Sequence, residues 1–156
     1  MKIVLFLKNE EKENVKEIIE YFVAYGYNDI ILFVKDSESY FSKSEKNYFI
    51  TNDIKLTVVN SIEMESTSQK LLYIKGSLDN TFLLVYSNKI IFADLDKLCL
   101  MHKNETNLAT LLIHHEKMIA CLLENEIFDY SLENFNFEKE ILKRVGQDLE
   151  LNQIEV

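Results

Sequence analysis

Short blocks of apolar residues, separated by polar segments, follow one another along this chain. Residues 3–7, 30–34 and 82–86 are continuously apolar. Such runs are typical of strands in a parallel sheet that is covered on both faces. We therefore expect these three strands to be neighbouring, parallel and central.

A helix is predicted between the first two strands. Over residues 15–25, apolar side chains recur at helical spacing and form one stripe that would pack on a sheet. Asn14 is placed to cap the start of this helix, and Gly26 stands where a glycine at the C′ position would end it.

The remaining chain continues the alternation of strands and helices. Further strands are expected at 54–59, 108–113, 118–123 and 149–156, and helices at 95–103, capped by Asp94, and at 137–145, ending at Gly146. Segment 40–49 reads as a short helix and 66–75 as a helix or loop. This order predicts one α/β domain over residues 1–156, with a mostly parallel central sheet flanked by helices.

Composition agrees with a single compact domain. The chain has 156 residues, of which 47% are hydrophobic, enough to bury a core. No apolar run approaches the roughly 18–20 residues that span a bilayer, and the first residues do not form a signal peptide. Cys99 and Cys121 lie in apolar runs and make no disulfide framework, so a reduced cytoplasmic location is expected.

Charge narrows the choice of partners. The formal net charge of −9 argues against binding nucleic acid or an anionic membrane, because both require a basic face. It suits a soluble protein or one that docks on a basic partner.

The segment after the first strand lacks the glycines of a phosphate-binding loop. Glycine permits the positive φ that brings backbone N–H groups close to a phosphate, yet no glycine precedes Gly26. Residues 8–14 instead include Glu10, Glu11 and Glu13, which place negative charge where a phosphate would lie. The expected scaffold is that of a nucleotide enzyme without its phosphate loop.

Several segments together resemble one known family. Residues 14–32, with Asn14-Val15-Lys16-Glu17-Ile18-Ile19 followed by Tyr25-Gly26-Tyr27, are similar to the first helix and second strand of the sugar nucleotidyltransferases. Segments 82–88, 93–98, 107–111, 126–130 and 137–144 follow in the family's order. The resemblance is to the glucose-1-phosphate cytidylyltransferase branch. It implies a reduced nucleotidyltransferase domain of the glycosyltransferase-A-like, Rossmann type.

The chain departs from the family where the family performs its chemistry. The glycine-rich loop with its arginine, the proline-lysine-proline stretch and the sugar-phosphate glycines have no counterparts, and the resemblance ends before the second metal-binding aspartate. Ser87-Asn88 stands where the family has a glycine and the aspartate that binds magnesium. Asn88 would be a weak metal ligand, because its carbonyl carries no charge. Lys70 occupies a place similar to a basic residue in the family's nucleotide-reading loop.

Other polar residues suggest weaker candidates. His114 and His115 are adjacent, so on a strand they would point to opposite faces; His102 on the preceding helix could approach one of them and form a two-histidine metal site. Cys99 is expected in the core, and Asp94 and Asp96 are expected to cap and charge a helix start. An acidic, solvated face is expected to comprise Glu124, Glu126, Asp129 and Glu133.

Two aromatic clusters are candidates for a protein interface. One comprises Tyr40, Phe41, Tyr48 and Phe49, and the other Phe128, Tyr130, Phe135 and Phe137. Either could also cover the sheet; the second is the stronger interface candidate because it precedes a strand expected at the sheet edge.

Three functions are consistent with these features. The first is a degenerate, non-catalytic nucleotidyltransferase-like protein that serves as a partner or regulatory subunit in surface-polysaccharide synthesis, with no cofactor. The second is an enzyme that binds a nucleotide or sugar phosphate near Lys70, Ser87 and Asn88, with Mg²⁺ if it is active. The third is a purely structural oligomerising module.

Overall fold

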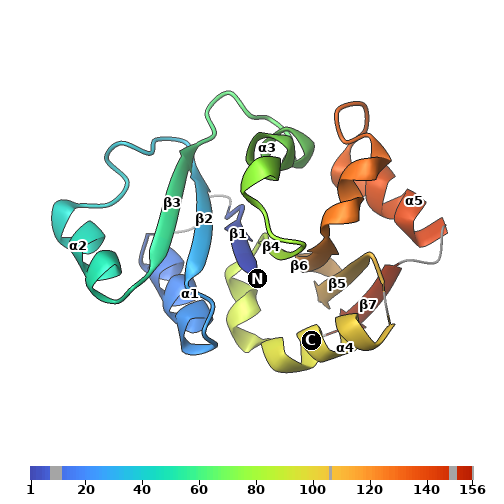
Figure 1. The fold of residues 1–156 in the computed structure, drawn as a ribbon, viewed down its shortest axis with the longest axis horizontal. Helices are drawn as coiled ribbons and strands as arrows, with labels where there is room; N and C mark the ends of the chain where they lie inside the picture. The colour runs from blue at the N-terminus through green and yellow to red at the C-terminus, as the bar shows by residue number, and fades with distance from the viewer. Residues whose placement is uncertain (8–11, 106, 148–150, 156) are drawn as a thin grey trace.

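A single mixed sheet organises the molecule. The computed structural model describes residues 1–7, 12–105, 107–147 and 151–155. Seven strands of this part form a sheet in the order β3-β2-β1-β4-β6-β5-β7. The strands are β1 Lys2–Leu5, β2 Asp29–Val34, β3 Lys55–Asn60, β4 Thr81–Val85, β5 Ala109–His114, β6 Lys117–Glu124 and β7 Leu151–Glu155. Figure 1 shows the order of the strands across the molecule.

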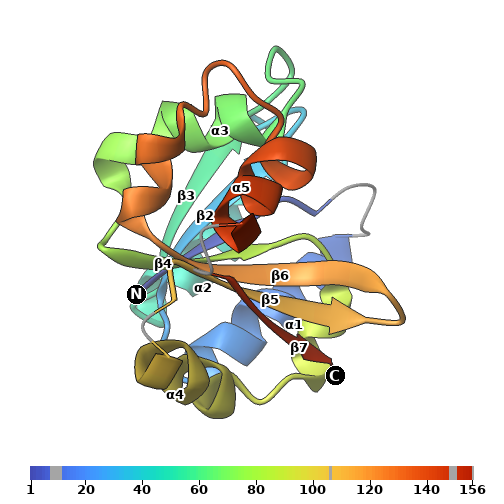
Figure 2. The same ribbon diagram turned by 90° about the vertical axis from the view of Figure 1, so that its right-hand side faces the viewer.

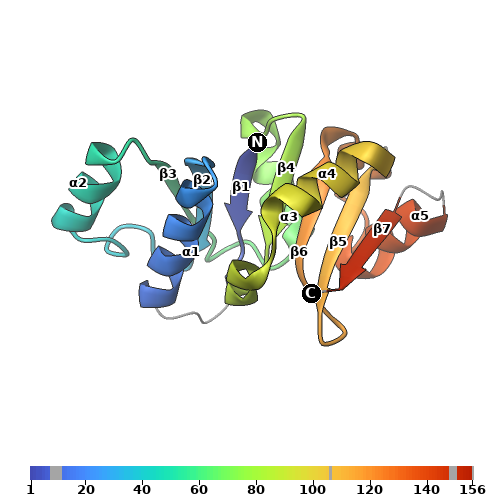
Figure 3. The ribbon, with the colours of Figure 1, turned by 90° about the horizontal axis from the view of Figure 1, so that it is seen from below.

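Helices cover both faces of the sheet. Their bounds are α1 Lys12–Ala24, α2 Lys43–Thr51, α3 Thr67–Ile74, α4 Leu95–Glu105 and α5 Leu142–Gln147. Figure 2 shows α3 and α5 above the sheet and α1 and α4 below it. Seen from below in Figure 3, α2 lies at the β3 end of the molecule. The expected class, a mostly parallel sheet flanked by helices, is confirmed.

The three continuously apolar runs form the centre of the sheet as predicted. β1 pairs in parallel with β2 on one side, with Ile3 opposite Ile30, and with β4 on the other, with Ile3 opposite Leu83. All three side chains are fully buried. Continuous burial explains why these strands lack the alternation of a half-exposed sheet.

The strand predicted at 118–123 is confirmed as β6, but its antiparallel direction was not predicted. β6 pairs antiparallel with both β4 and β5, whereas β5 pairs in parallel with the edge strand β7. The hairpin between β5 and β6 turns at His115 and Glu116, with φ of 47° and 62°. Two consecutive positive φ values are typical of a type I′ turn, which suits the twist of a tight hairpin.

Helix α1 confirms one predicted boundary and corrects the other. Gly26 has φ of 81°, and the N–H of Tyr27 donates to the carbonyl of Phe22, as in a Schellman motif. The helix, however, begins at Lys12, so Asn14 lies within it and is not its cap. Lys12, in the first turn, contacts Glu45 of α2 at 2.7 Å.

The segment predicted as one helix over 137–145 divides into two parts. A π-helical turn, Phe137–Ile141, precedes α5, which continues through Gly146 to Gln147. The carbonyl of Asn136 accepts from the N–H of Ile141, and its side-chain Oδ1 accepts from the N–H of Lys139 at 2.9 Å. The predicted helix end at Gly146 is therefore wrong by one residue, and the wide turn at its start was not predicted.

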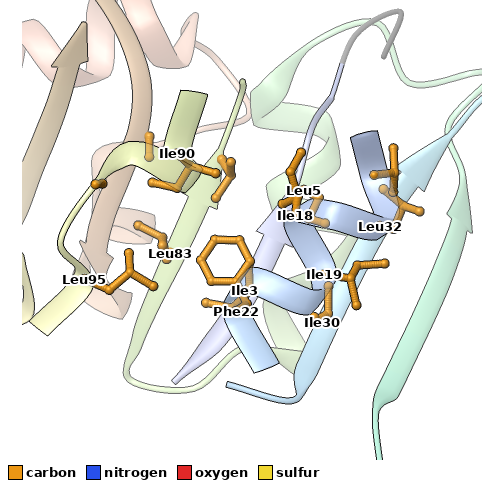
Figure 4. Packing of buried hydrophobic residues seen from close by; sticks show 14 of the residues in the cluster. Ile3, Leu5, Ile18, Ile19, Phe22, Ile30, Leu32, Leu83, Ile90 and Leu95 are labelled. Atoms are coloured by element: carbon orange, nitrogen blue, oxygen red, sulfur yellow. The ribbon is translucent and has the colours of Figure 1, made fainter. Parts of the chain in front are cut away.

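Each face of the sheet has its own hydrophobic core. On the α1 face, Ile18, Ile19 and Phe22 pack on Ile3 and Ile30 (Figure 4). Burying a side chain of this size contributes about 1.5–3 kcal/mol relative to leaving it exposed. The opposite core lies beneath α3 and α5.

The aromatic clusters belong mainly to these cores. Phe41 and Phe49 are buried, with ring centroids 5.0 Å apart, whereas Tyr48 is 46% exposed. Phe128 and Phe137, at the centre of the cluster proposed as an interface, are also buried within the domain. Tyr130 and Phe135 remain partly exposed, so this cluster mainly covers the sheet, and its role as an interface stays a prediction.

Candidate functional site

The carboxyl ends of the first four strands meet at one edge of the sheet. β1, β2, β3 and β4 are mutually parallel, so the segments that follow them emerge on the same side. The chain proceeds from β1 outward to β2 and β3 and then returns to the other side of β1 as β4. In open α/β sheets, ligands bind beside such a change of direction.

A cavity of about 750 Å³ lies at this edge. We call it the carboxyl-edge cavity. It is lined by residues that end β1 and β2 and by the segments after β2 and β3, namely Phe6, Leu7, Val15, Leu32, Phe33, Val34, Lys35, Tyr40, Ser61, Ile62, Met64, Glu65 and Lys70. Its volume lies within the range of small-molecule and cofactor sites, and its walls are mostly apolar.

Lys70 lines this cavity because of the way α3 begins. Ser66 caps the helix: its Oγ accepts from the N–H of Gln69, and the side-chain Oε1 of Gln69 accepts from the N–H of Ser66. The first turn therefore directs Lys70 back over the strand ends, with its Nζ 5.0 Å from the ring centroid of Phe6 and 5.9 Å from that of Phe33. A cation held on aromatic rings is pre-positioned, which reduces the entropy lost on binding an anion.

Lys35 adds a second cation to the lining, directly after β2. Two lysines beside aromatic walls suit a ligand that combines a phosphate or carboxylate with a planar or apolar part. Glu65 lies on the same lining and gives the site one carboxylate.

A smaller cavity of about 300 Å³ adjoins the first and shares Phe6, Glu65 and Lys70 with it. We call it the Glu138 cavity. Tyr86 OH donates to Glu138 Oε1 at 3.1 Å, and the hydroxyl of Thr67 donates to the same oxygen. Burial, reinforced by the nearby Glu138 carboxylate, raises the pKa of Tyr86 well above its usual value, so the phenol remains a donor.

Asn88 lies outside the two cavities described above that Lys70 lines. It begins the 3₁₀ turn η2 (Asn88–Phe92) after β4, and it lines neither the carboxyl-edge cavity nor the Glu138 cavity. The preceding Ser87 caps this turn, its Oγ accepting from the N–H of Lys89. The structure thus places Lys70 on the lining of the carboxyl-edge cavity, whereas Asn88 follows β4 at the same edge of the sheet and lies outside both cavities.

The acidic segment 8–14, predicted where a phosphate-binding loop would lie, is only partly within the described residues. Of the three glutamates, Glu10 and Glu11 are not described, and Glu13 is exposed on the first turn of α1.

His102 lies in a polar network and not in a two-histidine site. Its ring is 2% exposed, with Nδ1 at 2.8 Å from Thr110 Oγ1 and Nε2 at 2.8 Å from Glu124 Oε1. Thr81 Oγ1 donates to the same carboxylate. Glu124 was wrongly assigned to a solvated face, because the end of β6 lies beside α4 and β4; the other three acidic residues of that set are exposed.

The remaining candidates are structural. The rings of His114 and His115 lie 4.2 Å apart, so the expectation of opposite faces fails because His115 belongs to the hairpin turn. Cys99 is half-buried against the core, 3.6 Å from Tyr27 OH. Asp94 caps α4 as predicted, accepting from the N–H of Lys97 at 3.0 Å. Within the described ranges, no three His, Cys, Asp or Glu side chains are placed to hold a metal ion together.

Sequence reasoning did not identify Tyr86, Glu138 or Lys35 as site residues. Tyr86 ends the predicted β4 run, and Glu138 lies in a predicted helix, so both were assigned to elements and not to the cavity. A polar residue directly after a buried parallel strand was the available signal for Lys35.

Comparison with solved structures identifies proteins that share this fold. No protein-family model and no curated protein matches this chain. HddC from Yersinia pseudotuberculosis superimposes with a TM-score of 0.64 at 13% identity, covering 99% of this chain and 89% of that chain. A Bacillus anthracis protein assigned as a glucose-1-phosphate thymidylyltransferase gives 0.66 at 11% identity, covering 99% and 86%.

A third solved structure is CMP:2-keto-3-deoxy-manno-octonic acid synthetase in complex with CTP. It gives a TM-score of 0.63 at 7% identity, covering all of this chain and 89% of that chain. At these identities the similarity shows the fold alone. That fold is the sugar nucleotidyltransferase type, a Rossmann-like α/β domain of the glycosyltransferase-A-like class, which confirms the resemblance seen in the sequence.

Proposed function

We propose that this chain is a non-catalytic nucleotidyltransferase-like protein that binds a nucleotide or sugar phosphate in the carboxyl-edge cavity. The observation that carries the proposal is the cavity of about 750 Å³, lined by Lys35 and Lys70, at the ends of β1 and β2. Lys70 lies over aromatic rings, so it offers a phosphate a positioned cation beside an apolar surface. A purely structural module would have no need of this arrangement.

The absence of transfer activity is proposed from the chemistry of Asn88. Nucleotidyl transfer requires stabilisation of the charge that develops on the phosphoryl oxygens, usually by a metal held on carboxylates. Asn88 offers a neutral carbonyl where the resembling family has an aspartate. The alternative is an active enzyme, in which Asn88 and a rebuilt set of ligands would hold Mg²⁺ and the chain would form a nucleotide sugar.

A protein that binds such a ligand without transforming it suits a regulatory role. We therefore propose that the chain acts in the cytoplasm as a partner or regulatory subunit of an active sugar nucleotidyltransferase in surface-polysaccharide synthesis, or as a homo-oligomer. The edge strand β7 and the exposed Phe92 and Leu100 support an association with protein. No helix in the described ranges is long and apolar enough to cross a membrane.

Calorimetric titration tests ligand binding. We expect one or more of CTP, UTP, GTP and ATP, with and without Mg²⁺, to bind the wild-type chain. Lys70→Ala should weaken the affinity about tenfold, because it removes a charged hydrogen-bond donor. Lys75→Ala is the matched control: Lys75 lies over Phe128 and does not line the cavity. Failure of all four nucleotides and of common hexose 1-phosphates to bind would contradict the proposal.

A pyrophosphate-release assay tests the lack of catalysis. With each of the four nucleotides, each combined with common hexose 1-phosphates and Mg²⁺, release should remain at background. Turnover that persists through purification and disappears in Asn88→Ala would instead establish the active-enzyme alternative.

A further inference from the structure

We infer that Glu138 is a positioning residue for Lys70: it ties the first turn of α3 to the end of β4 and so fixes the cation in the carboxyl-edge cavity. The inference rests on the proposed function for its consequence in ligand binding. The geometry itself is independent of any ligand.

Glu138 joins three separate elements through one carboxylate oxygen. Its Oε1 accepts from the hydroxyl of Thr67, the first residue of α3, and from Tyr86 OH at 3.1 Å, at the end of β4. Glu138 itself belongs to the π-helical turn before α5. These partners lie 71 and 52 residues from Glu138 in the sequence, so the contact is purely tertiary.

Thr67 connects this contact to Lys70. The two residues are three apart on α3, which places them on neighbouring positions of one helix face. Both line the Glu138 cavity, and Lys70 continues from there into the carboxyl-edge cavity. A second tie holds the same turn, since Ser68 Oγ donates to the carbonyl of Phe135 at 2.8 Å. Holding the first turn of α3 in place therefore holds the backbone of Lys70, from which its side chain extends into the cavity.

The π-helical turn presents Glu138 in a defined direction. Asn136 caps the turn through Lys139, and the N–H of Asn136 donates to Glu140 Oε2 at 2.7 Å. Single π-helical turns occur frequently at functional sites, where they redirect a side chain from its ordinary helical position. The wide turn here directs a carboxylate to the strand end.

Nuclear magnetic resonance of isotope-labelled, reductively methylated lysines tests this inference without a ligand. In the wild-type chain the Lys70 methyl signal, assigned with Lys70→Arg, should be displaced by the ring currents of Phe6 and Phe33. Glu138→Ala removes the acceptor and should move this signal towards that of an exposed lysine. Glu138→Gln retains an oxygen acceptor for both hydroxyls and should preserve the displacement.

Two further variants and a control keep the test decisive if Glu138→Ala does not fold. Tyr86→Phe and Thr67→Val each remove one donor to Glu138 and should each shift the Lys70 signal part of the way. Glu133→Ala changes an exposed glutamate that lines neither cavity and should leave the signal in place. An unchanged Lys70 signal in a folded Glu138→Ala, or in both single-donor variants, would overturn the inference.

Titration with CTP then links the contact to binding. We expect Glu138→Ala to weaken CTP binding roughly fivefold to tenfold and Glu138→Gln to change it by less than about twofold. Equal weakening in both variants would show that Glu138 acts through its charge and would overturn the positioning role. A different result is that CTP does not bind the wild-type chain while the Lys70 signal still depends on Glu138. That result would contradict the proposed binding of CTP and support the positioning role of Glu138.

Discussion

At the scale of single residues, most buried polar side chains in this domain have specific partners. His102 is held by Thr110 and Glu124, and the Nζ of the buried Lys2 donates to the carbonyl of Ser77 at 2.5 Å. A buried donor or acceptor left without a partner costs about 1–3 kcal/mol, so such pairs favour one arrangement of the chain over its alternatives. Asp29 Oδ1 and Asn125 Oδ1 are buried without a protein partner.

Two glycines provide a matched test of backbone strain. Gly26 has φ of 81° and Gly76 has no positive φ, yet a Cβ at either position would meet nothing within 4 Å. We expect Gly26→Ala to lower the free energy of unfolding by about 1–2 kcal/mol, because an L-residue is strained in the left-handed region. Gly76→Ala should change it by less than about 1 kcal/mol. Urea denaturation measures both; equal effects would contradict the argument.

At the scale of elements, local signals define where helices begin. Both α2 and α3 start with a capping box, formed by Ser42 with Glu45 and by Ser66 with Gln69. Glu45 also accepts hydrogen bonds from Lys12 and Lys16, which hold the pKa of its carboxyl well below the usual range. One residue thus caps its own helix and joins it to α1.

Strand β4 is the element whose burial is most directly testable. Val85 is fully buried and pairs with Leu5 on one side and Ala120 on the other. Val85→Asp should destabilise the domain by more than about 4 kcal/mol, a large part of the 5–15 kcal/mol typical of a domain, because the carboxylate would have no partner.

Circular dichroism and solubility measure this effect, with Thr57→Asp as the control, since Thr57 is exposed on the edge strand β3. A soluble Val85→Asp variant with an unchanged melting temperature would contradict the central placement of β4.

At the scale of the whole molecule, the surface combines a strong negative charge with a few exposed apolar side chains. The net charge is −9, which favours solubility and repels copies of the chain from one another at low salt. Phe92 and Leu100, 70% and 60% exposed, belong to η2 and α4. Helix α4 lies on the same side of the sheet as α1 (Figure 2). Any self-association must gain enough from apolar burial to exceed this repulsion.

Light scattering tests the proposed association. At micromolar concentration and moderate salt we expect a mass above the 18.4 kDa of one chain. The double variant Phe92→Ser and Leu100→Ser should return the mass to that of a monomer, whereas Ile50→Ser on α2 serves as the control. A monomer at all concentrations, with no partner recovered from native extract, would leave the association without support.

Elements that depend on a local pattern of residues could be predicted without the structure. The strands β1, β2 and β4, the helix stripe of α1, the cap at Asp94 and the ending at Gly26 follow from residues adjacent in the chain. The periodicity of apolar residues and the chemistry of helix caps involve only a few consecutive residues, so both can be recognised in the sequence. The resemblance to sugar nucleotidyltransferases indicated the fold type for the same reason, through ordered local segments.

Which polar groups meet depends on how the strands and helices are arranged in space. The insertion of β6 between β4 and β5 brings Glu124 to His102, and the π-helical turn brings Glu138 to Tyr86 and Thr67. The physical reason is that a hydrogen bond depends on the distance between donor and acceptor in space. Separation along the chain affects only the entropy of closing the loop between them, so it does not indicate which groups pair. The carboxyl-edge cavity around Lys70 is likewise formed by the ends of strands that are far apart in the sequence.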